Sequence, residues 1–226
     1  FLPNFPDRAT VYKISPVAPT LLGFDKTRDK VENVNFTSQE TQIAQDVYQW
    51  ADPSSDLQRK ITINIFSSDF TVSSLFLTSV SLQALNNSNE KNDAIDRAKS
   101  FLEQMSLFTE DLDDTKTKTS LYSIADGTLI PASKVADAKI VRVDFFQKDV
   151  DKLSIYYDKG IGSTISLLIG KTNKGLEVIS ATYFHKNISK DASTYAIKSP
   201  ATAFAQLKQG EGYIASKQQD IVEVAI

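Results

Sequence analysis

The sequence predicts an α+β fold in which antiparallel β-sheets (meanders) are each packed by one or a few α-helices, with more strand than helix overall. Three observations support this prediction. Short apolar segments rich in β-branched and aromatic residues are separated by Gly, Asp and Asn turns, which favours antiparallel neighbours over βαβ units. Two segments combine helical periodicity with helix start and stop signals. The 226 residues, 41% of them hydrophobic, can form a core without a metal or a disulfide.

The composition excludes several classes of function. The formal net charge is −3, which argues against a binder of duplex nucleic acid, because neutralising phosphates requires clustered Lys and Arg. The chain has no cysteine and one histidine, which excludes zinc fingers, iron–sulfur clusters, thiol nucleophiles and sites that need two imidazoles. The sequence has no run of about 18 apolar residues that would predict a transmembrane helix. Its abundance of Ser, Thr, Asn and Gln favours an extracytoplasmic location.

The first part of the chain is expected to begin irregularly. Residues 1–30 contain most of the prolines and no sustained periodicity, although residues 11–14 have the composition of a short strand. Residues 41–50 alternate in polarity and contain β-formers, which predicts a strand. The capping-box pattern at residues 37–40 would instead begin a helix, and we prefer the strand.

A hairpin is predicted next. Residues 60–66 place alternating isoleucines on one face, residues 67–69 supply turn chemistry, and residues 70–77 return with further apolar side chains. Together with the preceding strand, this hairpin forms a three-stranded antiparallel meander with one apolar and one polar face.

The first clear helix is expected at residues 90–108. Asn89 or Ser88 is placed to cap it, and Glu90 and Asp93 lie where the helix dipole favours acidic groups. The apolar residues of this segment form one stripe, which predicts the buried face: Ala94, Ala98, Phe101, Leu102 and Met105.

Strands dominate the rest of the chain. They are expected at residues 120–124, 139–147, 152–157, 163–169, 176–186 and 193–197, and in a final run at residues 221–226. A second helix follows Ser199 as its cap, with Pro200 at its first position and Gly210 past its end. Within that helix, Phe204 and Leu207 are expected to point inward, together with Ala203.

The elements suggest a repeated helix-plus-sheet unit and three domains. These are residues 1–88, an irregular segment plus a meander; residues 89–198, a helix plus an antiparallel sheet; and residues 199–226, a helix and strands that begin a further, truncated unit.

The two helical patterns resemble a known class of domains. The residues are Asp93-Ala94-x-x-Arg97-Ala98-x-x-Phe101-Leu102 and Ser199-Pro200-x-x-Ala203-Phe204-x-x-Leu207-Lys208-x-Gly210-x-Gly212-Tyr213-Ile214. They are similar to helix-plus-sheet units of PepSY-like and YycH/YycI-like extracytoplasmic domains in uncharacterised membrane-anchored proteins of candidate-phylum bacteria. Further resembling stretches are Phe5-Pro6-Asp7-Arg8-Ala9-x-Val11-Tyr12 and Tyr48-x-Trp50. The resemblance implies an N-terminal membrane anchor outside this sequence and a binding or regulatory role, and it assigns no functional residue.

Catalytic chemistry has few candidates in this sequence. His185 is the one imidazole, at the end of a predicted strand, and we expect a structural or surface role for it. No Gly-x-Ser-x-Gly elbow is present, and the Gly160-x-Gly162 and Gly210-x-Gly212 pairs are turn glycines rather than phosphate loops. The acidic run Glu110–Asp114 could offer oxygens to Ca²⁺, but it lacks the Gly and distal Glu of an EF-hand loop, so we favour a solvated loop.

Aromatic residues give the remaining candidate binding site. Trp50, Tyr156 and Tyr157, with Tyr48, could stack on a ligand, although strand aromatics more often pack over a sheet. Adjacent tyrosines face opposite sides of a strand, so one of Tyr156 and Tyr157 is expected to be exposed at an interface.

These observations favour a non-catalytic extracytoplasmic binding, regulatory or scaffold module that recognises an envelope protein or polymer. No cofactor is predicted. The alternatives are an envelope glycan hydrolase that uses carboxylates alone and a Ca²⁺-dependent adhesion domain that uses the Glu110–Asp114 loop.

Overall fold

The computed structural model describes residues 7–15, 20–87, 89–151, 155 and 163–212. Within these residues it confirms a mixed, strand-rich α+β fold with antiparallel sheets. The chain divides into two units, which are described separately. The sheet unit comprises residues 17–155 and 163–185, and the ribbon unit comprises residues 1–16, 156–162 and 186–226.

The sheet unit contains most of the regular structure. Its helices and short 3₁₀ turns are α1 (Gly23–Glu32), η1 (Phe76–Thr78), α2 (Asn89–Gln104), η2 (Asp114–Lys116) and η3 (Val135–Asp137). Its strands are β2 (Thr41–Ala44), β3 (Val47–Ala51), β4 (Lys60–Asn64), β5 (Phe70–Ser73), β6 (Lys118–Ala125), β7 (Thr128–Pro131), β8 (Ile140–Phe145), β9 (Ile165–Thr172) and β10 (Gly175–Tyr183).

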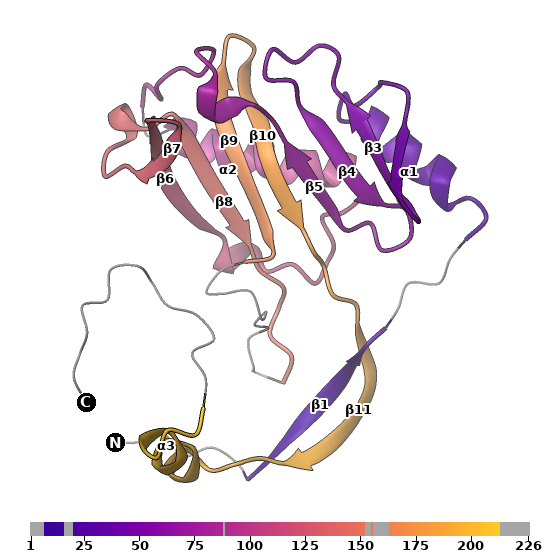
Figure 1. Ribbon diagram of the computed structural model, residues 1–226, viewed down its shortest axis with the longest axis vertical. Helices are drawn as coiled ribbons and strands as arrows, with labels where there is room; N and C mark the ends of the chain where they lie inside the picture. Colours follow the sequence, from indigo (N-terminus) through magenta and orange to yellow (C-terminus); the bar gives the residue numbers. More distant parts are fainter. Residues whose placement is uncertain (1–6, 16–19, 88, 152–154, 156–162, 213–226) are drawn as a thin grey trace. The chain divides into compact units, whose positions relative to one another are not determined.

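These strands form one large sheet of nine strands, in the order β2-β3-β4-β5-β10-β9-β8-β6-β7 (Figure 1). All neighbouring strands are antiparallel. The strands that precede α2 join those that follow it where β5 pairs with β10, for example at Val72 and Ala181. The domain boundary predicted between residues 88 and 89 therefore falls inside a single sheet.

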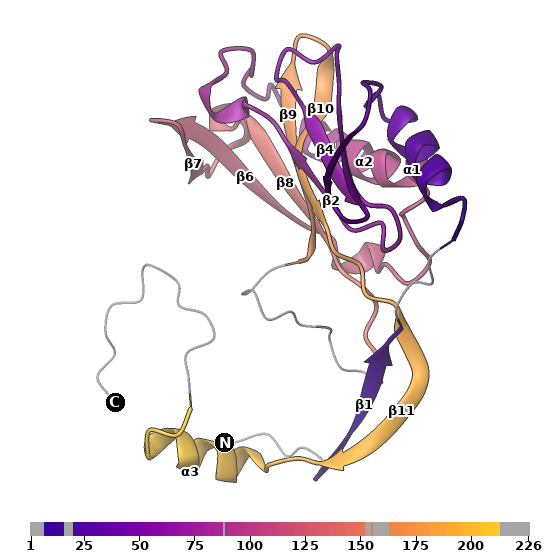
Figure 2. The same cartoon turned by 45° about the vertical axis from the view of Figure 1, so that its right-hand side comes forward.

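One face of the large sheet is covered by α1 and α2 (Figures 1 and 2). The predicted stripe is buried in the main core, as Ala94, Ala98, Phe101 and Leu102 of α2 and Met105 just after it. The helix ends at Gln104 rather than at residue 108, because the chain turns at Ser106, where φ is 56°. Val31 of α1 and Trp50 of β3 belong to the same core. This apolar burial is the main stabilising contribution to the unit.

The opposite face, which we call the open face, is covered only in part among the described residues. A second, smaller cluster lies on it, formed by Leu57, Phe76, Leu82, Ile140 and Ile179. Residues 76–82 include η1 and supply part of this cover.

The predicted hairpin is confirmed as β4 and β5, with Ser68 of its turn in the left-handed region (φ 59°). Residues 41–50 are extended, as predicted, but they form two strands rather than one. Asp46, at φ 59°, turns the chain between β2 and β3. Asp is among the residues that tolerate this conformation and so allows a tight turn.

Helix α1 corrects the prediction of an irregular segment as far as residue 30. Only Gly23, Thr27 and Val31 of this helix are buried, and the Thr27 hydroxyl donates to the Gly23 carbonyl at 2.8 Å. Val31 is the only large apolar side chain among these three, so the sequence of this helix gives a weak apolar signal.

The caps and strands of the sheet unit differ from the predictions in detail. At the start of α2, Asn87 Oδ1 accepts from the N–H groups of Asn89 and Glu90 at 2.9 and 3.3 Å. Of the predicted capping residues, Asn89 lies within the helix and Ser88 lies outside the described residues. Strand β7, which pairs with β6 beyond the Asp126-Gly127 turn, was not predicted. The strand predicted at residues 152–157 falls largely outside the described residues.

The ribbon unit is a pair of antiparallel strands followed by a helix. Strand β1 (Arg8–Ile14), predicted at residues 11–14, pairs with β11 (Ile188–Ala196), and α3 spans Pro200–Lys208. Ser199 caps α3 by accepting from the Thr202 N–H at 3.1 Å, as predicted. The predicted burial of the apolar side of this helix is wrong, because no residue of α3 is buried. The strand predicted at residues 221–226 lies outside the described residues.

Candidate functional site

A row of polar side chains crosses the open face, one from each of eight neighbouring strands. In register across the sheet these are Thr41, Gln49, Thr62, Thr71, Thr182, Ser166, Asp144 and Lys118. We call this set the polar row. It follows from strand alternation, because residues such as Ile61 and Ile63, on either side of Thr62, point into the core and are fully buried.

Members of the polar row differ in how their hydrogen bonds are satisfied. On β3 and β4 the polar groups bond to each other, since Gln49 Nε2 donates to Thr62 Oγ1 at 3.0 Å. On β9 and β10, the hydroxyls of Ser166 and Thr182 make no hydrogen bond with any described residue. Ser166 and Thr182 therefore have spare hydrogen-bonding capacity, as do Thr41 and Thr71 of the same row.

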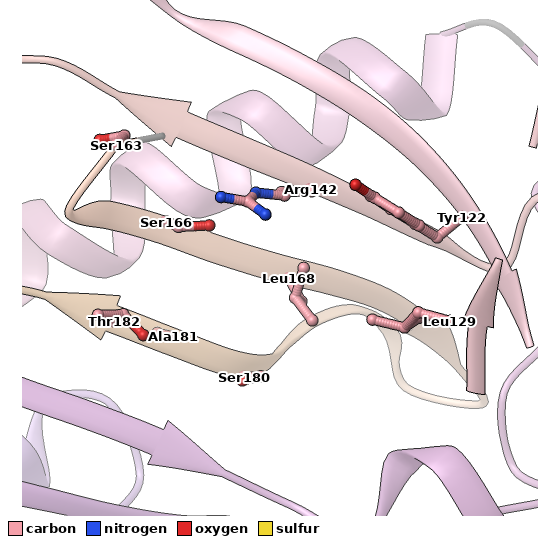
Figure 3. A pocket seen from close by; sticks show the side chains of 9 residues that line it. All are labelled: Tyr122, Leu129, Arg142, Ser163, Ser166, Leu168, Ser180, Ala181 and Thr182. Atoms are coloured by element: carbon pink, nitrogen blue, oxygen red, sulfur yellow. The ribbon is translucent and has the colours of Figure 1, made fainter. Parts of the chain in front are cut away.

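A shallow hollow of about 440 Å³ lies at this end of the open face (Figure 3). It is lined by Tyr122, Leu129, Arg142, Ser163, Ser166, Leu168, Ser180, Ala181 and Thr182. These residues come from strands β6 to β10 and from the segment just before β9. Strands far apart in the sequence thus contribute to one surface.

A β-bulge in β10 shapes one side of the hollow. Val178 and Ser180 oppose the consecutive residues Ile169 and Leu168 of β9, so Ile179 is an extra residue in its strand. Ile179 is fully buried in the second cluster, while Ser180 lines the hollow. Bulges of this kind redirect side chains on a sheet.

The hollow has an apolar end and a polar end. Leu129 and Leu168, with the ring of Tyr122, pack against the second cluster at one end. In Figure 3, the hydroxyl of Tyr122 points away from these leucines toward Arg142, and Ser166 lies beside the guanidinium.

Arg142 is the cation of the hollow. Its Nε donates to both carboxylate oxygens of Asp144, at 3.0 and 3.1 Å, and the two side chains are 34% and 13% exposed. The Nη groups make no hydrogen bond with a described residue. Lys118 and Lys60 lie on the same face and are exposed.

His185 belongs to a separate cluster at the end of β10. Its Nε2 lies 2.8 Å from Asp111 Oδ2, and Gln147 Nε2 donates to the same oxygen at 2.8 Å. The Thr109 hydroxyl donates to Asp111 Oδ1 at 2.5 Å. Burial opposes ionisation of this carboxyl, but the hydrogen bonds from Thr109 and Gln147 and the nearby His185 hold the pKa of Asp111 below its ordinary value.

This cluster does not have the geometry of a catalytic triad. In a triad, the carboxylate and the nucleophile bind different ring nitrogens of the histidine. Here Asp111 and the Thr109 hydroxyl both lie near Nε2, at 2.8 and 3.4 Å, and the hydroxyl is already bonded to the carboxylate. The contacts join the segment after α2 to the end of β10, which agrees with the structural role expected for His185.

The carboxylates of the acidic run Glu110–Asp114 bind different partners. Asp111 faces His185, Asp113 accepts from the Thr115 N–H at 3.0 Å, and Asp114 pairs with Lys99 at 3.2 Å. No group of three or more His, Asp or Glu side chains that could hold a metal occurs among the described residues.

The aromatic residues predicted as a binding site have different outcomes. Trp50 is 1% exposed and packs in the main core near Phe24 and Tyr48, so it is a core residue and offers no stacking surface. This corrects its assignment as a binding residue, and the reason is that its side of β3 faces the helices. Tyr156 and Tyr157 lie outside the described residues.

Sequence reasoning missed Arg142, Ser166, Ser180 and Thr182. The polarity alternation of β8 was one signal, since Arg142 and Asp144 alternate with buried Val141, Val143 and Phe145. The partners of that strand were not readable from the sequence, because the hollow depends on pairings between distant segments.

Comparison with protein-family models, curated proteins and solved structures gives no match. No helix in the described part of the chain has both the length and the apolar character needed to cross a membrane.

Proposed function

We propose that this chain is a non-catalytic binding module and that the open face of the large sheet is its binding surface. The observation that carries the proposal is the hollow, where one guanidinium and several hydroxyls have hydrogen-bonding capacity unused by the described protein. Polar groups placed beside apolar surface in a concave site are typical of ligand recognition.

The alternatives fit the geometry less well. A hydrolase that uses two carboxylates needs both beside one cleft, at a separation of about 5 to 9 Å. The hollow is lined by no Asp or Glu side chain, and Asp144 beside it is paired with Arg142. A Ca²⁺-dependent adhesion domain needs converging oxygens, and the carboxylates of Glu110–Asp114 have separate partners.

The proposed setting is extracytoplasmic, in a protein tethered to the membrane by an anchor outside this sequence. The Ser, Thr, Asn and Gln content supports it, as does the resemblance to PepSY-like and YycH/YycI-like domains. The proposed partner is accordingly an envelope protein or polymer.

The experiment is to obstruct the open face. Thr71→Arg and Thr182→Arg place bulky side chains on the polar row, and Glu103→Arg places the same side chain on the exposed side of α2 as the matched control. Binding of each variant, added as the 226-residue chain to washed membrane and wall fractions, is measured by sedimentation, so that the proposed anchor does not contribute. We expect the two face variants to lose most of the association and the α2 variant to retain it.

Equal association of all three variants would contradict the proposal. Circular dichroism and thermal melting of each variant establish that it is folded before it is compared. Turnover of a glycan substrate that is abolished by an Asp→Asn change would favour the hydrolase instead.

A further inference from the structure

We infer that the hollow binds a peptide C-terminus, with its free carboxylate on Arg142 and an aliphatic last side chain over Leu129 and Leu168. This inference rests on the proposed function, because it names the ligand class of the same face. Three features of the hollow support this inference: hydrogen-bond donors at its polar end, apolar surface at its other end, and the separation of these two ends.

The donors at the polar end match a carboxylate. Arg142 has both Nη groups available, and a guanidinium can donate two parallel hydrogen bonds to a carboxylate. The hydroxyls of Ser166, Thr182 and Tyr122 line the same hollow and make no hydrogen bond with a described residue. A carboxylate accepts about four hydrogen bonds, so these donors together can satisfy one.

Asp144 orients the guanidinium. It occupies Nε through both of its oxygens and leaves the Nη edge for a second anion. Since Asp144 is itself negative, it also weakens the binding of that anion. A site of this kind holds its ligand by matched geometry and apolar contact rather than by net charge alone, and binding of submillimolar strength is expected.

The apolar end matches an aliphatic side chain. Leu129 and Leu168 rest on the second cluster and are only partly buried, so each leaves apolar surface toward the hollow. Covering such surface is favourable in proportion to its area. Figure 3 shows the leucines at one end of the hollow and Arg142 with Ser166 at the other. A terminal residue carries an aliphatic group and a carboxylate on the same carbon atom, which suits this arrangement.

The size of the hollow restricts the ligand. About 440 Å³ in an open site accommodates the last two or three residues of a peptide. Preceding residues would pass onto the polar row, where Thr71 and Thr62 continue the line of hydroxyls across the sheet.

The test is a titration with acetyl-Ala-Ala-Leu that carries a free carboxylate, compared with the same peptide as its C-terminal carboxamide. Binding to the full chain is followed by the backbone amide signals of the sheet unit in NMR. We expect the free acid to shift the signals of Arg142, Ser166, Leu168 and Thr182, and to bind at least about tenfold more tightly than the amide, because hydrogen bonds to a charged group are the stronger ones.

Variants of Arg142 test whether this residue is the cation that binds the carboxylate of the peptide. Arg142→Gln is expected to weaken the free acid about tenfold and leave the amide unchanged, and Arg142→Lys is expected to lie between, since lysine lacks the planar fork. Arg28→Gln is the matched control, because Arg28 is also a part-exposed arginine paired with a carboxylate, Glu40 at 3.5 Å. The double variant Arg142→Gln/Asp144→Asn removes both charges and keeps the test valid if the single variant is unstable.

Equal affinity for acid and amide, an unchanged affinity in the Arg142→Gln and double variants, or no shift at the hollow would overturn the inference. These results are distinct from failure of the proposed function. If obstructing the open face abolishes association with the envelope while the free acid does not bind, the binding face is retained and the carboxylate ligand is rejected. If neither experiment shows binding, both proposals fail.

Discussion

Arg142 binds Asp144 through Nε alone, with both carboxylate oxygens within 3.1 Å, although the two residues lie only two positions apart on β8. Alternation places both side chains on the open face, and the short spacing brings the carboxylate to the Nε side of the guanidinium. The ion pair therefore fixes the arginine without occupying its Nη groups. This relationship makes the hollow a candidate anion site rather than a closed salt bridge.

Replacing Asp144 separates its contribution to the stability of the fold from its effect on the binding of an anion to Arg142. In Asp144→Asn, the free energy of unfolding should fall by about 1 to 3 kcal/mol, because Asp144 is buried and its carboxylate accepts hydrogen bonds from a charged group, Arg142. The affinity for the free-acid peptide should rise a few-fold, since a like charge beside the ligand is removed. Urea unfolding and the NMR titration measure the two quantities, with Asp93→Asn on exposed α2 as control. A fall in affinity would contradict this prediction. It would mean that Asp144 favours binding by orienting the Arg142 guanidinium more than its negative charge opposes binding of the peptide.

Gly170 allows the second cluster to lie close to β9. A Cβ at this position would meet Leu82 Cδ2 at 2.8 Å and Ile179 Cδ1 at 3.0 Å. Gly170→Ala should therefore destabilise the chain by about 1 to 3 kcal/mol, the usual cost of overpacking a core. The double variant Gly170→Ala/Leu82→Ala should cost less than the sum of its two single changes, because the second change makes room for the first.

Chemical unfolding of the four proteins measures this coupling. Ser166→Ala on the same strand is the control and should be near neutral, since its hydroxyl bonds to no described residue. Strict additivity of the Gly170 and Leu82 changes would show that the two residues are not in contact.

The Asp111 cluster predicts a pH dependence of stability. A carboxyl whose pKa is lower in the folded chain stabilises the fold above its unfolded value of about 3.9, and that contribution is lost as the pH falls through the folded pKa. The difference in unfolding free energy between the native chain and Asp111→Asn should therefore be larger at pH 5.5 than at pH 3. Urea titrations at the two pH values measure it, and Asp96→Asn on α2 serves as a control. A difference that grows on acidification would have the wrong sign for this account.

Trp50 provides a direct optical test of the core. It is the one tryptophan of the chain and is 1% exposed. Its fluorescence should be blue-shifted and poorly quenched by acrylamide in the folded state, and both properties should change on unfolding. Addition of the free-acid peptide should leave the emission unchanged, because Trp50 lies on the helix-covered side of the sheet. Efficient quenching in the native state would place the ring at the surface.

The sequence allowed prediction of those elements whose signals are local. The apolar stripe of α2, the hairpin of β4 and β5, and the Ser199 cap with Pro200 in α3 each depend on residues close together in the chain. Helix α1 was missed because its buried face consists of Gly23, Thr27 and Val31, and only the last of these is a large apolar residue.

The candidate site was not predictable in the same way. Arg142, Ser166 and Thr182 become neighbours only through the pairing of β8, β9 and β10. The link between Asp111 and His185 spans 74 positions in the chain, and no local pattern marks it. Trp50 failed as a binding residue for a related reason, since alternation defines two sides of a strand without saying which side the helices cover.

Site-specific photo-cross-linking tests the central claim, that the open face is the binding surface, most directly. A photoreactive residue is introduced at Thr182 on that face or at the exposed Glu103 of α2, in the protein as its own cells produce it. The account predicts a discrete adduct from position 182 that is suppressed by added free-acid peptide, and none from position 103. Adducts of equal yield from both positions, or from position 103 alone, would contradict it.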